Sequence, residues 1–226
     1  KNRLRSIVPV LSDEASRFED CVLTSKTHTI PTADNVGGVV SKAEMLDIYE
    51  SKFVKGTGRP YYDKYMSLPT NGKCPFCGIG TVSTLDHYLP KSKYPALAIT
   101  PKNMIPACRD CNLGKKRTFS PQNSEEEPLH PYFDDVEQDI WLSVRFEVAG
   151  KELVPTYFVR KPVAWNDLLF RRVENHMVLY NHPTQCMPPK KLQADRVYGM
   201  SFSIDVVKIS LRHPFMTRRL AGNSCS

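Results

Sequence analysis

The chain has 226 residues, with 31 Lys and Arg against 24 Asp and Glu, which gives a formal net charge of +7. Hydrophobic residues make up 41% and charged residues 24%, a balance that excludes a wholly disordered or collagen-like chain. No apolar run approaches the roughly 20 residues that a membrane-spanning helix needs, and the N-terminal sequence lacks the apolar core of a signal peptide. We therefore expect a cytoplasmic protein with no membrane segment, made of one domain or two small ones.

The N-terminal part, residues 1–70, is predicted to be a helical segment. Ser12 is followed by two acidic residues, which is typical of a helix cap and first turn. Ser41 and Glu44 have the spacing of a capping box, in which each side chain accepts a hydrogen bond from the other residue's backbone N–H. Three helices are expected here, over residues 13–25, 43–54 and 61–68.

Seven cysteines occur along the chain, and four of them form two C-x2-C pairs: Cys74, Cys77, Cys108 and Cys111. A two-residue gap lets both thiolates of a pair bind one ion at a Zn–S distance of about 2.3 Å. A disulfide framework fits less well, because the count is odd and no secretion signal is present. The spacing predicts a structural Zn²⁺ site, since four thiolates leave no open position for catalysis. Cys21, Cys186 and Cys225 are interpreted as ordinary thiols.

The segment between the two pairs alternates extended and turn-forming residues. Residues 81–87 are rich in β-branched side chains and predict a strand, and the two prolines in 88–100 predict a loop. A second short strand is expected over 102–108 and a short polar helix over 109–117. The predicted order is strand, loop, strand, helix, with a cysteine pair at each end.

Four polar residues occupy defined places in this frame. Asp86 and His87 end the first strand, Asn103 lies five residues before Cys108, and Asn112 directly follows the last cysteine of the pairs. In these residues the segment 73–117, within a predicted nuclease core over 71–120, resembles the HNH endonucleases, also called ββα-metal or His-Me finger nucleases. The likeness covers about a fifth of the chain.

The resemblance implies an α+β protein with a ββα-metal finger at its centre, and a role for each of these residues. His87 would be the general base that takes a proton from water, and Asp86 and Asn112 would hold a catalytic Mg²⁺ or Mn²⁺, separate from the zinc. Asn103 would orient the loop or the imidazole. Neighbouring residues of a regular strand face opposite sides, so the resemblance also implies a local distortion at the strand end.

Positive charge is concentrated in the same segment. Residues 71–120 hold eight Lys or Arg and two Asp, a formal charge of +6. This charge favours a phosphate-bearing partner, although a solvated charged face is the plainer alternative for any single residue. The candidate contacts to nucleic acid are Lys91, Ser92, Lys93, Lys115, Lys116 and Arg117. Four tyrosines could also contact nucleic acid, but their helical spacing favours the core: Tyr49, Tyr61, Tyr62 and Tyr65.

The C-terminal segment, residues 128–226, is predicted to mix a hairpin with helices. Residues 122–127 form a polar, acidic break that we interpret as a hinge, and the final RLAGNSCS resembles a loose tail. Strands over 140–148 and 153–160 form a hairpin, Asn166 caps a helix that runs to Tyr180, and another helix is expected within 190–200. His130, Asp134 and Asp135 could form a second metal site, but a loop anchor is the favoured interpretation.

These features predict metal-dependent hydrolysis of DNA, with RNA left open as a substrate. Resemblance to freestanding bacterial HNH proteins suggests the nuclease effector of an anti-phage defence system, beside a sensor or ATPase partner. Whether the protein forms a homo-oligomer is left open. One finger has one active site and cuts one strand, so a double-strand break would need a dimer or two encounters. The first alternative, a non-catalytic zinc-stapled nucleic-acid-binding module, would not need Asp86 or His87. The second, a redox or regulatory zinc protein, would not need Asn112.

Overall fold

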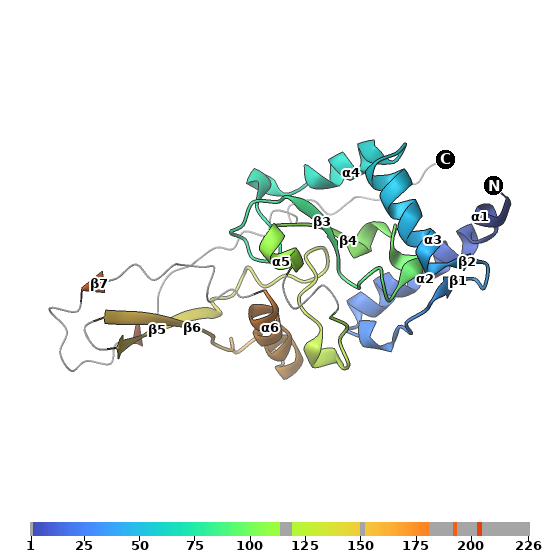
Figure 1. Cartoon of the computed structure of the whole chain (residues 1–226). Helices are drawn as coiled ribbons and strands as arrows, with labels where there is room; N and C mark the ends of the chain where they lie inside the picture. Colours follow the sequence, from blue (N-terminus) through green and yellow to red (C-terminus); the bar gives the residue numbers. More distant parts are fainter. Residues whose placement is uncertain (1, 114–118, 150–151, 181–191, 194–202, 205–226) are drawn as a thin grey trace.

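The computed structural model describes residues 2–113, 119–149, 152–180, 192–193 and 203–204 (Figure 1). Helices and small antiparallel sheets share these residues, so the predicted α+β class is confirmed. Within the same ranges no helix is both long and apolar enough to cross a membrane.

The N-terminal helices begin earlier than the sequence predicted. α1 (Asn2–Ser6) is followed by α2 (Val8–Leu23), so the expected cap at Ser12 is wrong. Pro9 lies in the first turn of α2, where its missing N–H costs no intrahelical hydrogen bond. α2 buries Phe18 and Val22, and this apolar face takes part in the largest core cluster.

The next elements carry the predicted capping box. A two-stranded ribbon, β1 (Asn35–Val36) and β2 (Val40–Ser41), leads into α3 (Lys42–Asp47). The Ser41 hydroxyl accepts from the Glu44 N–H, and a Glu44 carboxylate oxygen accepts from the Ser41 N–H at 3.0 Å, which confirms the capping box. The second half of the predicted helix is a wider π-turn, η2 (Ile48–Val54). The third helix is α4 (Arg59–Met66).

The middle of the chain forms a strand, a loop, a second strand and a helix, as predicted. β3 (Thr84–His87) pairs antiparallel with β4 (Met104–Ala107), and α5 (Arg109–Leu113) follows directly. β3 is shorter than the predicted strand, which began at residue 81. Residue 81 instead forms an isolated bridge with residue 73, which directly precedes the first cysteine pair. The connection contains two short 3-10 turns, η4 (Pro95–Leu97) and η5 (Pro101–Asn103).

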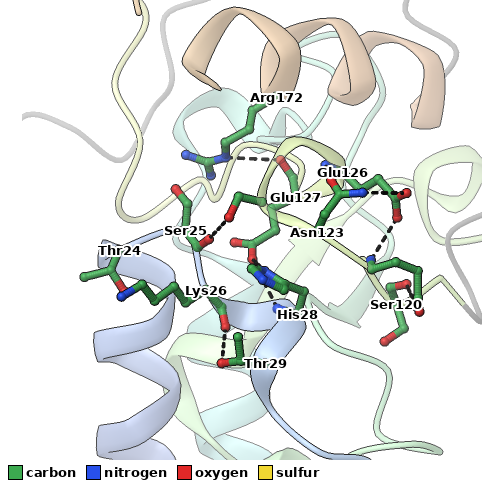
Figure 2. Close-up of polar contacts among 12 residues, drawn as sticks. Thr24, Ser25, Lys26, His28, Thr29, Ser120, Asn123, Glu126, Glu127 and Arg172 are labelled. Atoms are coloured by element: carbon green, nitrogen blue, oxygen red, sulfur yellow. Dashed lines mark hydrogen bonds and ion pairs between the residues drawn. The ribbon is translucent and has the colours of Figure 1, made fainter. Parts of the chain in front are cut away.

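The acidic segment that we interpreted as a hinge is instead anchored. It contains a 3-10 turn, η7 (Ser124–Glu126), and ends in Glu127, whose side chain is fully buried. A Glu127 carboxylate oxygen accepts from the His28 N–H at 3.1 Å and lies 2.8 Å from His28 Nδ1 (Figure 2). On its other side, the Glu127 carbonyl accepts from Arg172 (Figure 2). The segment therefore ties the N-terminal part to the C-terminal helix.

The C-terminal hairpin and helix agree with the sequence. β5 (Leu142–Ala149) and β6 (Glu152–Val159) pair antiparallel and project to one side of the molecule (Figure 1). Two short strands complete the sheet in the order β7-β6-β5-β8: β7 (Leu192–Gln193) and β8 (Ser203–Ile204). The helix expected within 190–200 is thus wrong at 192–193, and the rest of that range lies outside the described residues, as does RLAGNSCS.

Helix α6 (Asp167–Leu179) packs against this hairpin. The Asn166 side chain accepts from the Leu169 N–H at 2.8 Å, so the predicted cap is confirmed. Trp141, Trp165 and Val173 are buried together in the core that α6 shares with the hairpin.

The loop after Glu127 is held by an ion pair. Asp134 accepts two hydrogen bonds from the buried Arg172, at 2.9 and 2.6 Å, and a third from the His130 N–H at 2.7 Å. The His130 ring lies against the carbonyl of Lys102, with Nε2 to O at 3.1 Å. These contacts support the loop-anchor interpretation, and the second metal site is not found among the described residues.

Candidate functional site

The four predicted ligands form one buried cluster. The Sγ atoms of Cys74, Cys77, Cys108 and Cys111 all lie within 4.8 Å of one another. The sulfurs of Cys77 and Cys108 are 3.9 Å apart, and a tetrahedron with Zn–S bonds of about 2.3 Å has edges of roughly 3.8 Å. The spacing and the donor type both fit a Zn²⁺ ion, so the structure supports the predicted zinc site.

The backbone of the first pair is shaped around the sulfurs. Gly78 has a φ of +70°, which favours glycine, and its N–H donates to the Cys74 carbonyl at 2.7 Å. The Gly80 N–H donates to Cys77 Sγ at 3.3 Å. Hydrogen bonding from Cys108, with a smaller contribution from Gly80, holds the pKa of the Cys77 thiol well below its usual range, whereas hydrogen bonding from Cys108 raises the pKa of the Cys74 thiol. Within the first pair, Cys77 is therefore the sulfur that its neighbours favour as a thiolate.

A hollow of about 470 Å³ lies beside β3. Its walls come from η2, from β3, from the loop after β3 and from the end of α5. The polar residues that line it are Glu50, Thr84, Asp86, His87, Lys91, Ser92 and Asn112. Three of the four residues that carried the HNH resemblance therefore line one hollow, and the fourth, Asn103, is buried and does not line it.

Asp86 and His87 are both nearly buried, with exposed fractions of 9% and 6%. An Asp86 carboxylate oxygen accepts from the His87 N–H at 2.7 Å. His87 Nε2 lies 2.9 Å from the carbonyl oxygen of Ala98. The ladder with β4 continues through His87, which pairs with Met104, so the strand pairing does not show the local distortion that the resemblance implied.

Asn103 fixes the loop that follows β3. Its side-chain oxygen accepts from the Leu89 N–H at 2.7 Å, and its amide nitrogen donates to the carbonyls of Leu89 and Leu97 at 3.0 and 3.1 Å. The residue is fully buried, so water does not compete for these three hydrogen bonds. The loop between these anchors contains Lys91 and Ser92.

Asn112 joins the hollow to the cysteine cluster. Its N–H donates to the Cys108 carbonyl at 3.1 Å, because α5 starts at the second cysteine pair. Its side-chain amide donates to the Thr84 hydroxyl at 3.3 Å. The zinc site thus sets where α5 begins, and α5 sets where the Asn112 side chain lies.

The predicted phosphate contacts divide into three groups. Lys91 and Ser92 line the hollow, whereas Lys93 does not. The backbone carbonyl of Lys93 accepts from the Ala33 N–H at 3.0 Å. The other three lie outside the described residues: Lys115, Lys116 and Arg117.

Sequence reasoning did not assign several residues of the hollow to the site, among them Glu50, Thr84 and Tyr49. For Thr84, its position two residues before Asp86, on the same strand face, is a usable signal. Tyr49 is a different case. We predicted a core position for it, and it is indeed buried, but its ring also forms a wall of the hollow.

Two known proteins are similar to this chain over part of its length. Protein ea31 of Escherichia phage lambda is 32% identical over 164 residues, which covers 69% of this chain and 54% of that protein. Septu protein PtuB of Bacillus thuringiensis is 31% identical over 102 residues, which covers 42% of this chain and 38% of that protein. No protein-family model and no solved structure matches the chain.

The chain spans about half the length of the lambda protein and less than half of PtuB. The likeness to PtuB links part of this sequence to a Septu protein, and the buried four-cysteine cluster fits zinc.

Proposed function

We propose that the protein is a metal-dependent HNH endonuclease that hydrolyses phosphodiester bonds of DNA. One observation carries the proposal: Asp86, His87 and Asn112, from two separate elements, line the same hollow beside the cysteine cluster. The strand pair β3–β4 followed by α5 supports a ββα-metal finger, with the zinc joining its two ends.

His87 is proposed as the general base. A carbonyl oxygen only accepts hydrogen bonds, so the contact with Ala98 assigns the ring proton to Nε2 and leaves the basic lone pair on Nδ1. A base held in one tautomer can remove a proton from a water that attacks phosphorus.

Asp86 and Asn112 are proposed to hold a Mg²⁺ or Mn²⁺ ion. Hard divalent cations prefer carboxylate and amide oxygens, and the Asn112 amide nitrogen is already used on Thr84, which leaves the amide oxygen to act as a ligand. Such an ion offsets charge on the phosphate and stabilises the leaving oxygen. Asp86 and His87 line the same hollow, so ion and base would act on the same phosphate.

Lys91 and Ser92 are proposed to bind the phosphate itself. Both lie on the loop that Asn103 pins, and both line the hollow. The role of Asn103 is therefore indirect: it fixes the loop and thereby the two groups that meet the substrate.

A non-catalytic zinc-stapled binding module is the second candidate. It accounts for the four cysteines and the positive charge but gives no reason for Asp86, His87 and Asn112 to meet at one hollow. The redox alternative is weaker still, because each thiol of the cluster is buried.

We also propose a role in anti-phage defence, as a nuclease beside a sensor or ATPase partner. The likeness to Septu protein PtuB supports this role. The likeness to a protein of phage lambda fits equally well with a nuclease that serves a phage. Phage plaques would be counted on cells that carry the wild-type gene with its partner gene, the His87→Ala gene with the same partner, or neither. Fewer plaques only on the cells with the wild-type gene would support the defence role over the phage role.

The nuclease proposal is tested by plasmid nicking. Purified protein loaded with zinc should convert supercoiled plasmid to nicked circles when Mg²⁺ or Mn²⁺ is added. A protein that binds DNA but leaves it intact with either ion would support the binding module instead.

A further inference from the structure

Tyr49 contacts two of the residues proposed to act in the hollow. It is carried by the π-turn η2, and its ring is 4% exposed. The imidazole of His87 meets this ring edge to face, with centroids 4.9 Å apart and an interplanar angle of 65°. The ammonium nitrogen of Lys91 lies 4.0 Å from the same ring centroid. One aromatic ring therefore joins the proposed base to the proposed phosphate contact.

The chemistry of the ring suits both neighbours. An aromatic face carries partial negative charge and its edge partial positive charge, so an ammonium is attracted to the face and a second ring prefers an edge-to-face contact. Burial raises the pKa of the Tyr49 phenol well above its usual range, so the ring stays uncharged. The phenol hydroxyl also lies within 3.5 Å of the Leu85 carbonyl on β3.

An aromatic face attracts an ammonium without adding a formal negative charge beside it. Glu50, the next residue of η2, pairs with Lys55 at 2.7 Å and also attracts Lys91.

The π-turn η2 carries Tyr49. π-turns are rare and occur frequently at functional sites. Tyr49 packs with Leu85 and Met104, so β3 and β4 support it from behind, and Phe53 packs at 5.7 Å from within η2.

We propose that Tyr49 is a positioning residue, whose ring sets the Lys91 ammonium and the His87 imidazole on the same hollow. The catalytic part of this inference rests on the proposed nuclease function. The plainer alternative is that Tyr49 only fills the core. A matched pair of variants separates the two: Tyr49→Phe keeps the ring, and Tyr49→Leu keeps an apolar side chain without it.

The first measurement needs no nuclease activity. Lysine amines are methylated with a ¹³C label, and the Lys91 signal is assigned by its loss in Lys91→Met. Because a methyl group above an aromatic face is shifted upfield, we expect a displaced Lys91 signal in wild type and in Tyr49→Phe. In Tyr49→Leu the signal should move to the position of exposed lysines. An unchanged Lys91 signal in Tyr49→Leu overturns the contact.

The second measurement is plasmid nicking by the same folded variants. We expect Tyr49→Leu to lower kcat/KM about tenfold, as the loss of a partly buried cation–π contact implies, and Tyr49→Phe to restore most of this loss. The double variant Tyr49→Leu/Lys91→Met should lose less than the product of the two single losses, because part of the effect of Tyr49 acts through Lys91. Two results contradict the inference. One is an equal loss of kcat/KM in Tyr49→Phe and Tyr49→Leu, and the other is a double variant whose loss is the full product of the two single losses.

The two measurements also separate the inference from the function on which it rests. A wild-type protein that shows the displaced Lys91 signal but nicks no DNA overturns the nuclease function and the catalytic part of the inference, while the contact itself stands.

Discussion

The Nε2 atom of His87 donates to the backbone carbonyl of Ala98 at 2.9 Å. Ala98 directly follows Leu97, whose carbonyl accepts from the Asn103 side chain at 3.1 Å. The loop after β3 is therefore fixed at this end by the proposed base and by Asn103 together. A change that loosens the loop should disturb the base as well.

Asn103→Ala should impair both stability and cleavage. The substitution leaves the backbone groups of Leu89 and Leu97 without their partner, at a cost of about 1–3 kcal/mol for each buried unpaired group. Displacement of the loop should slow plasmid nicking by about 100-fold, since catalytic geometry tolerates little movement. Urea denaturation and nicking rates check the two effects. Asn2→Ala, at an exposed site, is the control and should change neither. Normal nicking by Asn103→Ala would argue against the loop's role.

Cys74→Ser should release zinc and unfold the centre of the molecule. A hydroxyl is a poor zinc ligand, and the metal links the first cysteine pair to the start of α5. Zinc content by atomic absorption and secondary structure by circular dichroism give the readouts. Cys21→Ser, at a half-buried cysteine outside the cluster, should keep one zinc per chain. A folded, fully zinc-loaded Cys74→Ser protein would count against a four-thiolate site.

Gly80→Ala tests how closely the chain approaches the sulfurs. An added Cβ at this position would come within 2.7 Å of the Cys108 sulfur, so that sulfur would have to move. We expect zinc to be lost to a chelator at least about tenfold faster than from wild type, because one displaced ligand weakens the site. Thr81→Ala, at the exposed neighbouring position, is the matched control. Equal rates in the two variants would mean that the cluster adapts to the extra methyl group.

Glu127→Ala tests the anchor between the N-terminal part and α6. The carboxylate is fully buried and lies against the backbone and the ring of His28, so its removal leaves both without a partner. We expect the free energy of unfolding to fall by about 2–4 kcal/mol. Glu125→Ala, an exposed glutamate two residues earlier, should stay within about 0.5 kcal/mol of wild type. Urea denaturation of both variants makes the comparison, and equal midpoints would show that Glu127 is not an anchor.

Local sequence rules predicted the parts of the fold that depend on neighbouring residues. The capping box at Ser41 and Glu44 and the cap at Asn166 depend on spacings of three residues, and each is present. The acidic run ending at Glu127 was misinterpreted as a hinge because its partners, His28 and Arg172, are 99 and 45 residues away. A polar residue buried by distant partners resembles a loop residue when only its neighbours are considered.

The candidate site shows the same division. The two cysteine pairs could be found by spacing alone, whereas Asn112 was singled out only by the resemblance to the HNH endonucleases. The role proposed for Tyr49 could not be found from the sequence. It depends on a π-turn and on contacts with His87 and Lys91, which lie far along the chain. Helical spacing correctly indicated that Tyr49 is buried, but it wrongly predicted a core position for Tyr61, which is 67% exposed. It carried no information about which groups would contact the Tyr49 ring.

The most direct test of the central claim compares the rate of plasmid nicking by wild type and by His87→Ala in the presence of Mg²⁺. Zinc content and thermal melting of both proteins establish that each is folded. The account predicts that wild type nicks DNA and that His87→Ala is at least about 100-fold slower, as expected for the loss of a general base. Equal rates in two folded, zinc-loaded proteins would contradict the assignment of His87 as the base.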